Sequence, residues 1–352
     1  MAIEHVIRPA VLILAFLAVA AAESAADAGC KIVDLTERYS QVAKQSGRLD
    51  PKHQVELFRR QLVLEHPDLY GENGLGFKSR SDLDAAIVRA LGAPPSTTAK
   101  IQKTARAVER SLPEYVRVFE KTFPDFRCDF SIYVVNSLNR LDGAGRVIEG
   151  KPSLILGADV IASEPMRSRG ILIIHELFHR YHYEVAGFSD DDSEHNPLWR
   201  ALWVEGLATY VSMRLNPPAS MQDALIAPSD LVLRAKRIVP ELIGELRPNL
   251  DRSDPQLFAS AFKYRGPDAN PPSRFGYYLG TLLAQEMAKT HSLTRLAHMG
   301  PREVREAIGV VLQRLQLEFR ERSEWRGSHC VTRAVAAVSY FAFRIADIPV
   351  ST

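Results

Sequence analysis

The sequence has little net charge, few cysteines and no apolar run long enough to span a bilayer. Its 44 Lys and Arg residues against 42 Asp and Glu leave a formal net charge of +2, too little for the whole surface to attract phosphate backbones. We therefore expect no nucleic-acid partner. With 46% hydrophobic and 24% charged residues, the 352-residue chain has the composition of a globular protein of one large or two modest domains, not of a disordered or collagenous one.

The longest apolar segment lies near the N-terminus, where ten apolar residues from Val11 to Ala20 follow Arg8. A membrane-spanning helix needs about 20 such residues, whereas a short apolar core followed by small residues is typical of a signal peptide. We expect residues 1–22 to be a signal peptide that is cleaved near Ala22. The mature protein would then be periplasmic or secreted and have no membrane span, and an uncleaved anchor is the alternative.

Three cysteines, Cys30, Cys128 and Cys330, remain after that cleavage. In an exported protein an odd number predicts one disulfide and one leftover thiol, and the residues do not say which two pair. In a lipoprotein, Cys30 would carry a lipid anchor and Cys128 would pair with Cys330. Against this alternative, Asp27 stands where a lipobox has an apolar residue.

Hydrophobic periodicity predicts a mostly helical α+β protein. Residues 23–125 form an expected N-terminal helical region, and residues 126–352 form an expected second domain. The expected strands cover 130–135 and 153–161, on either side of a turn at 142–145. Residues 330–348 fit a helix or a strand. The expected helices cover 54–65, 81–91, 96–119, 165–186, 196–215, 275–289 and 302–322.

The segment His175-Glu176-Leu177-Phe178-His179 lies within one of these expected helices. A spacing of four residues returns two imidazoles to one helix face, one turn apart, so that both can bind a single metal ion. Glu176 would then lie beside the ion, where it can take a proton from a bound water. The pattern also arises by chance, but the apolar run before it, from Ile171 to Ile174, predicts burial in a core.

A zinc site needs a third protein ligand. A metzincin would have Gly at position 182 and His at 185, whereas this sequence has His182 and Val185. The following helix instead offers Glu205, 26 residues after His179, and two antiparallel helices can bring its carboxylate to the ion. We expect His182 itself to lie at the surface or behind the ligands.

The HExxH segment and the later segment Leu202-Trp203-Val204-Glu205-Gly206-Leu207-Ala208-Thr209-Tyr210 together resemble the gluzincin metallopeptidases of the peptidase MA-like superfamily. The clear resemblance covers about residues 150 to 290. It implies a thermolysin-like zincin core, in which a small mixed sheet covers the active-site helix. It also implies one Zn²⁺ per chain, held by His175, His179 and Glu205, with Glu176 as the general base.

A further likeness lies at Tyr277-Tyr278-Leu279-Gly280. In gluzincins of the aminopeptidase type, a Tyr in a Y-x-x-G element stabilises the tetrahedral intermediate, which implies this role for Tyr277, with Tyr278 in reserve. The likeness fails at Gly157–Ile161, because those enzymes have Gly-x-Met-Glu-Asn there. Asp159 or Glu164 are the available substitutes for that Glu, and aminopeptidase specificity is unsupported.

The resemblance implies zinc-dependent hydrolysis of peptide bonds in a peptide or protein substrate. The alternatives are a catalytically inactive binding protein with a zincin fold and a zinc hydrolase that acts on a non-peptide amide or ester. We also expect the sheet edge at 153–161 to bind an extended substrate by strand addition. The sequence leaves the substrate, the endo or exo preference and the oligomeric state open.

Overall fold

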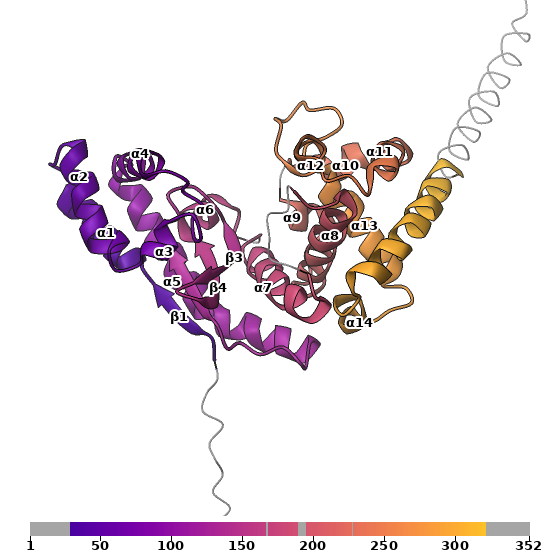
Figure 1. The fold of residues 1–352 in the computed structure, drawn as a ribbon, viewed down its shortest axis with the longest axis horizontal. Coiled ribbons are helices and arrows are strands. Elements are labelled where there is room, and N and C mark those ends of the chain that lie inside the picture. The colour runs from indigo at the N-terminus through magenta and orange to yellow at the C-terminus, as the bar shows by residue number, and fades with distance from the viewer. Residues whose placement is uncertain (1–28, 167, 189–194, 227, 322–352) are drawn as a thin grey trace, which may run out of the picture.

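The computed structural model describes residues 29–166, 168–188, 195–226 and 228–321. The expected signal peptide, Cys330 and the undecided segment 330–348 lie outside these residues. In the described part the protein is α+β and mostly helical, with one mixed four-stranded sheet. Figure 1 shows the sheet among the N-terminal helices in one half of the molecule, the C-terminal helices in the other half, and α7 (Ser168–Ala186) between them.

The sheet has the strand order β1-β2-β4-β3. Its first three strands are parallel, with Lys31 opposite Ser131 and Ser131 opposite Ser153, and β3 runs antiparallel to β4. β2 and β4 are rich in β-branched and aliphatic side chains that lie buried in the core, which suits central strands. The strands are β1 (Lys31–Asp34), β2 (Ser131–Val135), β3 (Gly143–Ile148) and β4 (Lys151–Gly157).

Two expectations about this sheet are wrong. The expected turn at 142–145 is the beginning of the edge strand β3, and the strand expected over 153–161 ends at Gly157, where α6 (Ala158–Ser163) begins. Since β4 pairs with β2 on one side and with β3 on the other, it is not a sheet edge. Glycine at position 157 lets the segment before β3 approach β4 closely, because a Cβ there would lie 1.9 Å from the carbonyl oxygen of Leu141.

The N-terminal region contributes to the sheet through β1, which precedes the expected helices. A disulfide joins Cys30, just before β1, to Cys128, just before β2, with the two Cα atoms 4.9 Å apart. The pairing of Cys128 with Cys330 is therefore wrong, and so is a lipid on Cys30, because that sulfur is already bonded. Such bonds persist in oxidising compartments.

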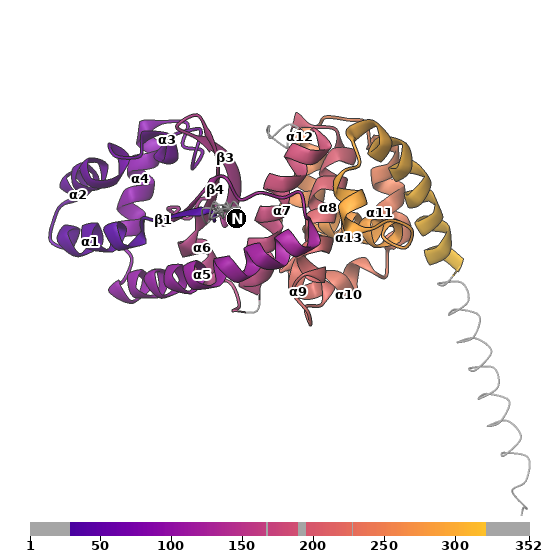
Figure 2. The ribbon, with the colours of Figure 1, turned by 90° about the horizontal axis from the view of Figure 1, so that it is seen from below.

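The helices largely follow the apolar periodicity of the sequence. The long α5 has one buried face, which packs on α1, α6, α7 and the strands β1 and β2, and Figure 2 shows it running below the sheet toward α7. No helix among the described residues combines the length and the apolar character needed to cross a membrane. The helices of the first half are α1 (Thr36–Ser46), α2 (Pro51–Phe58) with the π-helical turn Arg59–Val63, α3 (Pro67–Tyr70), α4 (Arg80–Leu91) and α5 (Pro95–Thr122).

The second half of the molecule consists of helices and connecting loops, and its described residues contain no strand. Its centre is α8, which packs on α7 and most extensively on α13. Both α7 and α8 start close to their expected positions, at Ser168 and at Leu198 after the N-cap Pro197. The helices are α8 (Leu198–Arg214), α9 (Met221–Leu225), α10 (Leu231–Ala235), α11 (Val239–Leu246), α12 (Pro255–Phe262), α13 (Phe275–Met287), α14 (Leu293–Ala297) and a final helix over 301–321.

Candidate metal centre

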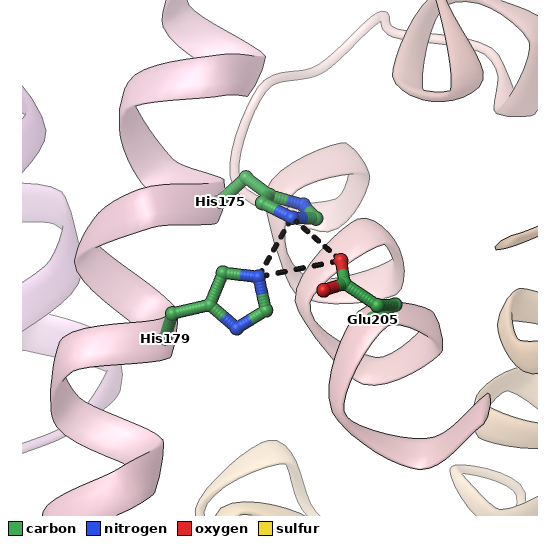
Figure 3. A group of neighbouring side chains, drawn as sticks. All are labelled: His175, His179 and Glu205. Carbon is green, nitrogen blue, oxygen red and sulfur yellow. Dashed lines mark hydrogen bonds and ion pairs between the residues drawn. The ribbon is translucent and has the colours of Figure 1, made fainter. Parts of the chain in front are cut away.

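Three side chains from α7 and α8 converge at the centre of the molecule. His175 and His179 lie one turn apart on α7, and Figure 3 shows both rings directed at the carboxylate of Glu205 on α8. Each offers one ligand atom, and these atoms all lie within 4.8 Å of one another. The structure thus brings together the three residues that the sequence predicted as ligands, and this group can bind a metal ion.

The distances within this group suit a tetrahedral ion. The two Nε2 atoms are 2.9 Å apart, and each lies 3.4 Å from Oε2 of Glu205. Zinc bonds of about 2.0–2.1 Å at tetrahedral angles separate neighbouring ligand atoms by about 3.3 Å. Two edges of the triangle match this value and the third is shorter. Two imidazoles and one carboxylate are also the donor set of catalytic zinc sites that keep an open position.

The surrounding helices fix these ligands in a core. The run Ile171–Ile174 on α7 is buried, as are Leu202 and Trp203 on α8. Burial lowers the pKa of His175, which favours the neutral ring that a metal requires. Burial by itself would raise the pKa of Glu205. The charge of His179 and hydrogen bonds from both histidines outweigh this effect, so the pKa of Glu205 lies well below its usual range.

Glu176 lies beside the ligands and is 8% exposed. Burial raises the pKa of its carboxyl to about 8. The edge strand β3 passes directly over it, because a Cβ on Gly143 would lie 2.3 Å from Cγ of Glu176. Glycine at this position therefore makes room for the glutamate beneath the strand, and Glu176 reaches the cleft that the ligands line.

The structure separates the two neighbouring tyrosines of α13. Tyr277 lines the cleft together with the three ligands, whereas Tyr278 is 2% exposed and packs in the core. Burial and then the Glu205 carboxylate raise the pKa of Tyr277 above its usual range, so the phenol stays protonated and able to donate a hydrogen bond. Only Tyr277 of this pair is in a position to act on a group in the cleft.

His182 and Asp159, two further residues considered for the site, do not line the cleft. His182 is fully buried against Phe178, Phe188 and Trp203, away from the cleft and not at the surface, and burial lowers its pKa to about 3. Asp159, considered as a substitute for an amine-binding glutamate, accepts hydrogen bonds from the backbone N–H groups of Ser137 and Asn139 instead. Asp159 therefore serves the loop after β2.

Sequence reasoning missed part of the cleft wall. Residues 143–146 of β3 form one side, with Arg146 at the end of this stretch, and Arg274 lies just before α13. Asp142 also lines the cleft, and Tyr183 stacks on the ring of His179 with an interplanar angle of 17°. No local pattern distinguishes Arg274 and the residues of β3, because they reach the site only through the packing of β3 and α13 around α7. Tyr183 lies one turn after His179 on α7, and the helical spacing could have identified it.

Comparison with known proteins gave no match: no family model, curated protein or solved structure matches this chain. The function is therefore inferred from the geometry of the site. The site combines a metal-binding group of two imidazoles and one carboxylate with a buried carboxyl, a protonated phenol and an open cleft. Such a site can activate a water molecule and stabilise a negative charge that develops on a bound carbonyl.

Proposed function

We propose that this protein is a zinc-dependent peptidase of the gluzincin type with a thermolysin-like catalytic core. The observation that carries the proposal is the convergence of His175, His179 and Glu205 with the buried carboxyl of Glu176 beside them. A purely structural zinc site has four protein ligands and needs no adjacent acid. Three ligands, a cleft and a neighbouring carboxyl instead favour catalysis.

The residues of the chain divide the chemistry between them. Zinc bound to the three ligands would bring the pKa of a water molecule close to neutrality and polarise the substrate carbonyl. Glu176 takes a proton from the attacking water and passes it to the leaving amine. Tyr277 donates its phenolic hydrogen to the oxygen that gains charge in the transition state.

The edge strand β3 is the proposed platform for the peptide. Among the described residues, β3 is an outer strand of the sheet, with a neighbour on one side alone. Four of its consecutive residues, 143–146, line the cleft. An extended peptide can pair with such an edge through backbone hydrogen bonds. Strand addition at β3 would place the scissile carbonyl beside Glu176, over which the strand passes.

The disulfide and the N-terminal sequence together favour export. The Cys30–Cys128 disulfide requires an oxidising environment to persist. The apolar segment Val11–Ala20 has the length of a signal-peptide core. We propose that the protein acts in a periplasm or outside the cell.

Substitution of the general base tests this function. The purified, zinc-loaded protein and its Glu176→Gln variant are incubated with a mixture of internally quenched peptides, and cleavage is followed by fluorescence. We expect the parent to cleave peptides and Glu176→Gln to keep its zinc but lose about 100-fold or more of the rate. The matched control is Glu184→Gln, an exposed carboxylate on the same helix, 3.0 Å from Arg180.

The remaining outcomes separate the alternatives. Full activity of Glu176→Gln would contradict the general-base role. Bound zinc without cleavage of any peptide, ester or amide would identify an inactive binding protein. Cleavage of small esters or amides but not of peptides would identify a hydrolase of another class.

A further inference from the structure

Arg274 is an unusual residue in the wall of the metal cleft. It precedes α13 with φ of 62°, in the left-handed region that favours glycine. Its guanidinium lies 4.6 Å from the ring centroid of Tyr277, and it lines the same cleft as the three ligands. Strained backbone of this kind is concentrated at functional sites. Glycine would fit here without strain, so the arginine at this position is a candidate for a functional role.

The guanidinium of Arg274 has no polar partner among the described residues. No hydrogen bond or ion pair joins it to residues 29–166, 168–188, 195–226 or 228–321, although the side chain is half-buried. A guanidinium carries five N–H donors, and a partly buried charge is stable when a counter-charge or hydrogen-bond acceptors are close. The donors of Arg274 are thus available to a molecule that enters the cleft.

The second arginine of the cleft differs in this respect. Arg146 donates from Nε to the carbonyl oxygen of Gly74, at 3.3 Å, and from Nη1 to that of Gly145, at 2.6 Å. These bonds hold the side chain along β3 and the loop before α4. Arg146 therefore serves the cleft wall, and it offers a matched control of the same charge in the same cleft.

Two carboxylates whose charges act on Arg274 or on the adjoining Tyr277 do not neutralise Arg274 through contact. The charge of Glu164 interacts with that of Arg274, and the charge of Asp142 acts on the neighbouring Tyr277. Neither carboxylate forms an ion pair with Arg274 within 4.0 Å. Glu205 is itself a member of the ligand group, and Glu176 lies beside that group. An arginine fork with free donors is the preferred partner of a carboxylate, which it can bind through two parallel hydrogen bonds.

We propose that Arg274 binds a carboxylate of the substrate on the α13 side of the metal, so that the cleft selects peptides that present a carboxylate at that position. This inference rests on the proposed peptidase function and specifies its substrate class. The carboxylate belongs either to an acidic side chain or to the C-terminus of the peptide, and both present the same chemistry to the guanidinium. The stacking on Tyr277 keeps the guanidinium oriented and close to the reacting carbonyl.

A binding measurement tests the proposal without relying on hydrolysis. The probes are fluorescein-labelled octapeptides with a central Phe-Leu pair, bound to the zinc-loaded Glu176→Gln protein and followed by anisotropy. In one arm a single Glu is compared with Gln at each flanking position, and in the other a free C-terminus is compared with an amidated one. We expect a preference of about tenfold or more for the carboxylate member of one arm.

The arginine variants are made in the same Glu176→Gln background. Arg274→Gln should abolish the preference and leave the affinity for the carboxamide peptide unchanged. Arg146→Gln should retain the preference. Arg274→Gly is the second variant, because glycine adopts the left-handed backbone without strain and keeps the fold while it removes the guanidinium. Zinc content and thermal unfolding of each variant verify that the site is intact.

Three results would overturn the proposal. The first is that neither arm shows a preference for the carboxylate peptide. The second is that the preference survives in both Arg274 variants. The third is that Arg146→Gln loses the preference to the same extent, which would indicate a general effect of charge. If the preference follows Arg274 but the parent cleaves no peptide, the carboxylate site stands and the peptidase function fails. If peptides are cleaved without a preference, the function stands and the carboxylate site fails.

Discussion

Gly206 on α8 and Gly280 on α13 meet backbone to backbone. A Cβ on Gly206 would lie 2.2 Å from the carbonyl carbon of Gly280, and a Cβ on Gly280 would lie 2.3 Å from the carbonyl oxygen of Leu202. Glu205 directly precedes one of these glycines, and Tyr277 lies about one turn before the other. The close approach of the two helices therefore brings the carboxylate ligand and the phenol into one cleft.

Gly206→Ala is expected to separate these helices. The added methyl group has no room, and overpacking of this kind lowers the free energy of unfolding by about 1–3 kcal/mol or more. Urea unfolding followed by circular dichroism measures the loss. Gly244→Ala is the control, since its nearest neighbour, Nε2 of Gln316, would be 3.5 Å away, and alanine inside a helix should be neutral or stabilising. Equal stability of the two variants would contradict the close helix contact.

Gly143→Ala is expected to impair activity through Glu176 and to spare metal binding. The new Cβ would lie 2.3 Å from Cγ of Glu176, so the carboxyl or the strand has to move. A displacement of about 1 Å at a catalytic group costs up to about 100-fold in rate. Gly309→Ala, whose nearest neighbour would be 3.8 Å away, serves as the control. A parental rate in Gly143→Ala would show that β3 does not constrain the general base.

Glu205→Ala is expected to remove most of the metal affinity. The parent should hold about one equivalent of zinc, measured by atomic emission after dialysis, and the variant should bind more than about 100-fold more weakly, since loss of even an outer-shell partner costs 10- to 100-fold. Glu184→Ala removes an exposed carboxylate from α7 and should keep the full equivalent. Zinc retention by Glu205→Ala would exclude this residue as a ligand.

Asp125 links α7 to the segment after α14, and its carboxylate is expected to make the stability of the protein depend on pH. Its carboxylate accepts hydrogen bonds of 2.8 Å from the Tyr181 hydroxyl and from His298 Nε2. Burial works to raise the pKa of Asp125, but these hydrogen bonds and the His298 charge lower it overall. Because the pKa is lower in the folded state, the ionised carboxylate stabilises the folded protein at pH values above the unfolded carboxyl pKa of about 3.9. This stabilisation is lost as the pH falls through the folded pKa.

Asp125→Asn should therefore lower the free energy of unfolding near pH 7 by about 0.5 kcal/mol, a small amount because solvent screens this exposed carboxylate, and the difference from the parent should shrink below about pH 4. Urea titrations across this range measure both effects. Asp129→Asn removes an exposed carboxylate four residues away and should leave the stability near its parental value at each pH. A constant difference between Asp125→Asn and the parent would contradict the linkage.

The Cys30–Cys128 disulfide closes a loop over a sequence separation of 98 residues. Loop-closure entropy for such a length stabilises the folded state by about 4–5 kcal/mol. We expect Cys30→Ser, Cys128→Ser and the double variant to lose the same amount, because each removes the same bond. Denaturant midpoints under non-reducing conditions provide the measurement. Comparable destabilisation by Cys330→Ser would point to a different pairing.

Local patterns in the sequence predicted much of the helical structure and the HExxH pair. The apolar spacing of three and four residues identified α4 and α5, and the same periodicity brings His175 and His179 to one face of α7. These features depend on neighbours within one or two turns, so the sequence alone contains them. The position of Glu205 was predicted from a resemblance, and the structure brings it to both histidines.

Tertiary structure decided the features that depend on distant parts of the chain. Asp142-Gly143-Ala144-Gly145 resembles a turn and becomes an edge strand because β4 offers it a partner and Gly143 clears Glu176. The partner of Cys30 follows from the parallel pairing of β1 with β2, and Arg274 joins the cleft only because Gly206 and Gly280 let α13 approach α8. Sequence periodicity thus determined most of the longer helices and which of their residues share a helix face. Long-range pairing and close backbone packing determined the cleft, because neither has a signature within a single segment.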